Sequence, residues 1–70
     1  MMVKKREKLS EARKSQGLSR VQLADLVGVS KEHIRSLEYG RVRPSIPVMF
    51  KISRVLQKDP EWLFEDVTKM

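Results

Sequence analysis

The 70-residue chain contains no cysteine, so it forms neither disulfides nor zinc sites with thiolate ligands. A chain this short buries only about 60% of the surface that it exposes when unfolded. Its stability must therefore come from packing in one small domain, which we expect to span residues 1–70. No apolar run approaches the ~20 residues that cross a bilayer, and no apolar segment follows the basic residues near the N-terminus. We therefore expect a cytoplasmic protein with neither a membrane span nor a signal peptide.

Residues arranged to bind a metal ion or to catalyse a reaction are also scarce. His33 is the single histidine, and the carboxylates are scattered without the clustering of a metal site. Serine, histidine and aspartate do not occur in the arrangement that nucleophilic catalysis needs. We expect no catalytic residue, no metal ion and no cofactor.

Positive charge is what the chain has in excess. Fifteen Lys and Arg residues against nine Asp and Glu give a net charge of +6. This balance favours a polyanionic partner, although a soluble basic domain without one has the same composition. The basic residues are spread over several segments and form no single amphipathic face, so a membrane surface is the weaker interpretation. In the basic segment 4–8 we expect a solvated first helical turn, with an arm on DNA as the alternative.

Helical periodicity runs through the chain, and no segment alternates between apolar and polar residues as a strand does. The expected fold class is therefore all-α. Helices are expected over residues 4–16, 20–27, 31–38 and 46–56, with a short last helix that begins at Pro60. The residues that can cap helix N-termini are Ser19, Ser30, Ser45 and Asp59.

Two of these helices are joined by the tripeptide Gly28-Val29-Ser30, which is the spacing of a helix-turn-helix unit. The small side chain of Ala24 lets the two helices approach closely. Gly28 can adopt the positive φ that such a turn needs. A glycine-containing helical hairpin is common, but here it occurs with two N-caps and a basic net charge. The sequence therefore predicts a DNA-binding helix-turn-helix over residues 19–38.

The helix over residues 31–38 has two different faces. At about 100° per residue, Ile34 and Leu37 point toward the core and His33 lies at the edge. The opposite face is a continuous polar arc of Lys31, Glu32, Arg35, Ser36 and Tyr39. A solvated charged surface is the usual role of such an arc. Arginines on both sides of the helix favour a role at DNA instead, because they would meet phosphates beside a groove; they are Arg20, Arg41 and Arg43.

The order of these residues resembles the phage-repressor and Cro type of helix-turn-helix protein, the Xre family, over almost the whole chain. The matching residues are Leu9 with Arg13, Gly17-Leu18-Ser19, Leu23-Ala24, Gly28-Val29-Ser30, Ile34, Leu37-Glu38, Gly40, Pro44-Ser45, Lys51-Ile52 and Leu56, followed by Trp62-Leu63. The resemblance implies a five-helix, lambda-repressor-like domain. It also implies binding to operator DNA, commonly as a dimer on two half-sites. We therefore expect a sequence-specific transcriptional regulator that acts as a repressor.

The resemblance further implies roles for single residues. The base-contacting positions are those of Lys31, Glu32 and Ser36, with Arg35 beside them. The phosphate-contacting positions are those of Ser19, Arg20, His33, Tyr39, Arg41 and Arg43. Arg20 and Tyr39 depart from the Gln and Asn that the family often has there. Tyr39 could donate its hydroxyl to a phosphate or pack on the following loop.

Arg13 lies four residues after Leu9, on a face where a core residue is expected, and Glu38 lies four residues after Ile34. The resemblance implies that Arg13 and Glu38 pair. Burial makes such a pair necessary, because a lone buried charge is costly. We predict a partly buried salt bridge between the first and third helices.

The last two helices carry more apolar side chains than one small core can absorb, and clustered aromatic residues favour an interface. These side chains are Val48, Phe50, Val55, Trp62, Phe64 and Val67. We expect a homodimer through the last helix and the C-terminal tail, with Trp62, Phe64 and Val67 at the interface. The alternative is an antitoxin-like or adaptor protein that binds a protein partner through this surface.

Overall fold

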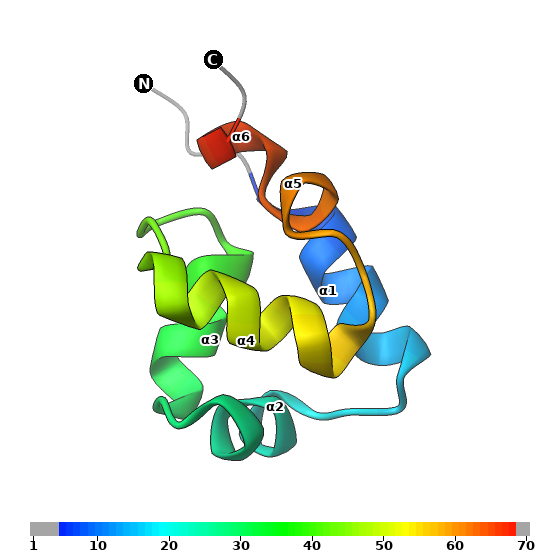
Figure 1. Cartoon of the computed structure of the whole chain (residues 1–70). Helices are drawn as coiled ribbons and strands as arrows, with labels where there is room; N and C mark the ends of the chain where they lie inside the picture. Colours follow the sequence, from blue (N-terminus) through cyan, green and yellow to red (C-terminus); the bar gives the residue numbers. More distant parts are fainter. Residues whose placement is uncertain (1–4, 69–70) are drawn as a thin grey trace.

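The computed structural model describes residues 5–68, and this part of the chain contains helices and turns but no strand (Figure 1). The helices are α1 (Glu7–Ser15), α2 (Arg20–Val27), α3 (Lys31–Glu38), α4 (Ile46–Leu56), α5 (Pro60–Leu63) and α6 (Glu65–Thr68). The predicted all-α class is confirmed. The first helix begins at Glu7, and position 4 of its predicted range lies outside the described residues.

Serine caps determine where three of the helices begin. The hydroxyl of Ser19 accepts from the backbone N–H of Gln22, and the Gln22 side chain accepts from the backbone N–H of Ser19, so both halves of a capping box are present. Ser30 and Ser45 cap α3 and α4 in the same way through their hydroxyls. Gly28 ends α2 with φ 77°, a left-handed conformation that glycine adopts without strain.

The helices enclose one core, to which five of them contribute. α2 packs against both α3 and α4, while α1 contacts α3 and α5 (Figure 1). The buried apolar residues are Leu9, Ala12, Leu23, Ala24, Val27, Ile34, Leu37, Met49, Ile52, Leu56, Leu63 and Phe64. This packing supports the α2–turn–α3 unit on the side that faces the core and leaves the opposite face of α3 exposed.

The C-terminal part differs from the prediction in two ways. The single short last helix is divided into α5 and α6, because the backbone at Phe64 leaves the helical conformation with φ −123° and ψ 42°. The Phe64 side chain turns inward and is 0% exposed, so its placement at a dimer interface was wrong. Trp62 remains 39% exposed, whereas Val67 is half-buried against the core.

Candidate nucleic-acid interface

α3 presents the two faces that its sequence predicts. Ile34 and Leu37 are completely buried beneath it. On the outer side Lys31, Glu32 and Arg35 are exposed, and His33 and Ser36 are half-buried. The helix thus offers a charged surface at its N-terminal end on a rigid support, which is the arrangement that reading base edges requires.

The segments on either side of α3 add further cations to the same region. Arg41 and Arg43 are exposed in the loop after α3, while Arg20 is half-buried at the start of α2. The exposed Ser19 uses its hydroxyl to cap α2, which anchors the backbone there. The positions that the resemblance assigns to phosphate contacts thus lie at the start of α2, within α3 and after its C-terminal end, and all of them remain at least partly open to solvent.

Tyr39 lies at the C-terminal end of α3 and is surrounded by positive charge. The centre of its ring is 5.1 Å from Nζ of Lys5, and 5.5, 5.5 and 5.3 Å from Cζ of Arg20, Arg35 and Arg41. These four cations come from four separate segments. Lys5 precedes α1, Arg20 begins α2, Arg35 belongs to α3, and Arg41 lies in the loop after α3. Cations are attracted to the face of an aromatic ring, so Tyr39 gathers side chains that would otherwise repel one another.

This cluster changes the acidity of the Tyr39 phenol. The guanidinium of Arg20, followed by that of Arg35, lowers the pKa of Tyr39 from its ordinary value of 10.0, because both stabilise the phenolate. Tyr39 is the only tyrosine, so phenolate absorbance reports on it alone. We expect the titration midpoint to lie below 10.0 in the parent and to rise toward 10.0 in Arg20→Ala.

Arg43→Ala serves as the control for this titration, because Arg43 does not contribute to the shift. Its midpoint should equal that of the parent. A parent midpoint at or above 10.0, or one that Arg20→Ala does not move, would contradict the described cluster.

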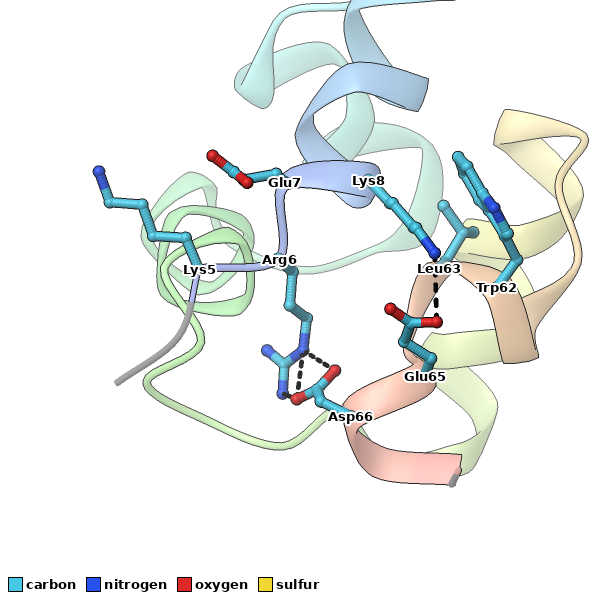
Figure 2. Close-up of a pocket in the computed structure, with 8 residues that line it drawn as sticks. All are labelled: Lys5, Arg6, Glu7, Lys8, Trp62, Leu63, Glu65 and Asp66. Atoms are coloured by element: carbon cyan, nitrogen blue, oxygen red, sulfur yellow. Dashed lines mark hydrogen bonds and ion pairs between the residues drawn. The ribbon is translucent and has the colours of Figure 1, made fainter. Parts of the chain in front are cut away.

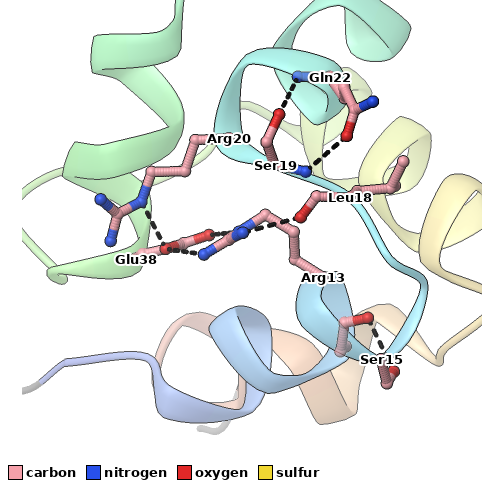
Figure 3. Close-up of polar contacts among 8 residues, drawn as sticks. Arg13, Ser15, Leu18, Ser19, Arg20, Gln22 and Glu38 are labelled. Carbon is pink, nitrogen blue, oxygen red and sulfur yellow. Dashed lines mark hydrogen bonds and ion pairs between the residues drawn. The ribbon is translucent and has the colours of Figure 1, made fainter.

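A buried carboxylate connects three helices behind this surface (Figure 3). Glu38 is 3% exposed, and its Oε2 accepts from Arg13 Nε at 2.6 Å. Its Oε1 accepts from Arg13 Nη2 at 3.3 Å and from Arg20 Nε at 2.9 Å. Arg13 Nη1 also donates to the carbonyl of Leu18 at 2.8 Å. The structure thus brings together the pair predicted from the sequence.

Arg20 has a second role that the sequence interpretation did not include. The hydrogen bond to Glu38 raises the pKa of the Arg20 guanidinium, because the carboxylate stabilises the protonated form. Nε is directed to Glu38 and the guanidinium also lies against the Tyr39 ring, so any contact of Arg20 with a ligand would be made by its Nη groups beside Tyr39. Glu38 therefore ties α1, α2 and α3 together at the point where the predicted interface begins.

Arg6 is a buried charged residue that the sequence interpretation missed. In the segment 4–8, expected to be a solvated first turn, position 4 lies outside the described residues and Lys5 is exposed but precedes α1. The expectation was wrong for Arg6, whose side chain is 4% exposed. Arg6 pairs with Asp66 of α6 (Figure 2). A signal was available, because Arg6, Leu9 and Arg13 fall on one helical face at spacings of three and four residues.

Comparison with known proteins gives consistent matches. A family model, HTH_3, described as helix-turn-helix, matches residues 9–63. An uncharacterized HTH-type transcriptional regulator of Archaeoglobus fulgidus is 39% identical over 59 residues, which cover 84% of each chain.

Two solved structures share the fold. The restriction-modification controller protein C.AhdI from Aeromonas hydrophila is 30% identical, with a TM-score of 0.76, over 84% of this chain and 89% of the other. The DNA-binding domain of the P22 C2 repressor is 26% identical, with a TM-score of 0.77, over 93% and 87% of the two chains.

Within the described residues, no helix has the length and apolar character needed to cross a membrane.

Proposed function

Because the chain belongs to the helix-turn-helix family HTH_3, a family of DNA-binding transcription regulators and not of enzymes, we propose that it is a cytoplasmic, sequence-specific repressor. It inserts α3 into the major groove of an operator with two half-sites. The observation that carries this proposal is the exposed charged face of α3, opposite the buried Ile34 and Leu37 and flanked by the exposed Arg41 and Arg43.

In this proposal the outer face of α3 reads bases. Lys31 can donate to O6 and N7 of guanine, and Glu32 can accept from N4 of cytosine. Arg35 and Ser36 lie one turn further along the same face and complete the base-contacting set. The preferred half-site therefore contains G·C pairs at the positions that Lys31 and Glu32 meet.

The surrounding residues hold the backbone of the DNA and fix the orientation of α3. The arginines around Tyr39 support this role, since they place several positive charges near the C-terminal end of α3. The proposed phosphate contacts are Ser19, Arg20, His33, Tyr39, Arg41 and Arg43.

A homodimer would place two copies of α3 about 34 Å apart, one DNA turn, in adjacent major grooves. We propose that α5 and α6 form the dimer contact through Trp62 and Val67. The exposed indole of Trp62 supports this choice, because large exposed aromatic side chains are typical of interfaces. Phe64 contributes only by shaping α5 and α6 from inside.

Two substitutions separate base reading from backbone binding. Lys31→Ala is expected to relax the base preference at one position per half-site, changing discrimination there by about 1–3 kcal/mol. Arg43→Ala removes one positive charge as well, but it should weaken binding to all sequences alike. Competition binding against a set of single-base operator variants checks both. If Lys31→Ala weakened all sequences equally, α3 would not be the reading element.

A further inference from the structure

The C-terminal end of α3 is capped from outside the helix. The last four carbonyls of a helix have no partner within it. Here the backbone N–H of Arg6 donates to the carbonyl of Glu38 at 2.8 Å, and Arg6 Nη1 donates to the carbonyl of Leu37 at 2.6 Å. A cation at this end also interacts favourably with the helix dipole. Arg6, from the segment before α1, thus completes the end of α3.

The same guanidinium closes the turn that follows α3. Arg6 Nη1 also donates to the carbonyl of Val42 at 2.9 Å. Leu37 and Val42 flank the proposed phosphate contacts Tyr39 and Arg41, so one nitrogen joins the two ends of the segment that carries them. The Arg41 N–H, bonded to the carbonyl of Ser36 at 3.0 Å, fixes the inside of the turn.

Asp66 of α6 in turn holds Arg6 (Figure 2). Arg6 Nε lies 3.0 and 3.1 Å from the two carboxylate oxygens of Asp66, and Nη2 lies 3.0 Å from Oδ2. Multiple charge-assisted bonds of this kind fix the plane of a guanidinium. The Asp66 side chain is 44% exposed, so it can be altered without opening the core.

We propose that Arg6 is a positioning residue for DNA binding, and that Asp66 holds it in place, so that the docking of α6 sets the affinity of the turn after α3 for DNA phosphates. The inference rests on the proposed function and extends it to regulation. Any contact that draws α6 away from Arg6 would weaken the Arg6 bonds to the carbonyls of Leu37 and Val42 and loosen the turn, leaving the Leu37 carbonyl with its bond from the N–H of Gly40 at 3.1 Å. The C-terminal surface and the DNA surface are thereby coupled through one side chain.

Asp66→Asn tests this coupling, with Glu65→Gln as its control. Glu65 lies on the same helix, forms an exposed pair with Lys8 at 3.1 Å, and loses the same single negative charge on substitution. General electrostatics predicts slightly tighter DNA binding for both variants. Our proposal predicts that Asp66→Asn binds operator DNA about five- to tenfold more weakly than the parent, and that Glu65→Gln does not. Equal affinities of the two variants would overturn it.

Two further measurements distinguish the proposed coupling from a general loss of stability. In an Arg41→Ala background, the additional loss caused by Asp66→Asn should be smaller than in the parent, because one of the phosphate contacts that the turn positions is already gone; a full additional loss would overturn the proposal. Amide hydrogen exchange at Gly40 and Arg41 should accelerate in Asp66→Asn and not in Glu65→Gln. This measurement needs no DNA. Failure of the parent to bind DNA would therefore refute the proposed function, while unchanged exchange would refute the role of Asp66.

Discussion

Replacing Glu38 by glutamine is expected to lower the free energy of unfolding by about 3–5 kcal/mol, the range for breaking a buried ion pair. The neutral amide cannot balance the charge of Arg13, which is buried with it. It also leaves Arg20 without its carboxylate partner. Three helices lose their common contact, so the loss should appear as a lower urea midpoint with an unchanged slope.

Glu65→Gln is the matched control for this experiment, because it changes the net charge by the same amount. The Lys8–Glu65 pair is solvent-exposed, and pairs of this kind contribute at most about 1 kcal/mol. Its unfolding midpoint should stay near that of the parent. If Glu38→Gln unfolds at the midpoint of the parent, the buried carboxylate does not stabilise the fold.

Affinity for DNA is expected to fall about 10⁴-fold between 50 and 200 mM salt. This estimate follows from a dimer that makes about eight phosphate contacts, for which the slope of log K against log salt is near −7. Binding measured over this range in one buffer checks the slope. Arg43→Ala removes one contact from each protomer and should make the slope less steep by about 2.

Salt dependence also tests the oligomeric state. A monomer would make half as many contacts and give about half the slope. Sedimentation at high micromolar concentration should show a dimer. A monomeric mass would reject the dimer and leave α5 and α6 available to a different protein partner, as the antitoxin-like interpretation requires. Affinity that does not change with salt would contradict backbone binding altogether.

The local features of the fold could be predicted because they depend on neighbours in the sequence. The serine caps, the left-handed Gly28 and the two faces of α3 each follow from a few consecutive residues. The resemblance to phage-repressor helix-turn-helix proteins is confirmed by the family match and by the fold shared with the P22 C2 repressor domain. Pairing of Arg13 with Glu38 was implied by that resemblance, and the structure contains the contact.

The features that sequence reasoning missed depend on residues far apart in the chain. Arg6 and Asp66 are 60 positions apart, and nothing in either segment alone indicates that they meet. The inward turn of Phe64 is a second example, since it depends on the break between α5 and α6. Apolar composition alone could not separate the buried Phe64 from the exposed Trp62 two residues before it.

Selection from random duplex DNA tests most directly whether the outer face of α3 reads bases. We expect the parent to enrich one site made of two symmetric half-sites, with centres about one DNA turn apart and G·C pairs at defined positions. Lys31→Ala, selected in parallel, should lose the preference at one position in each half-site and keep the spacing. Enrichment of no sequence, or the same site for both proteins, would contradict the assignment of α3 as the reading helix.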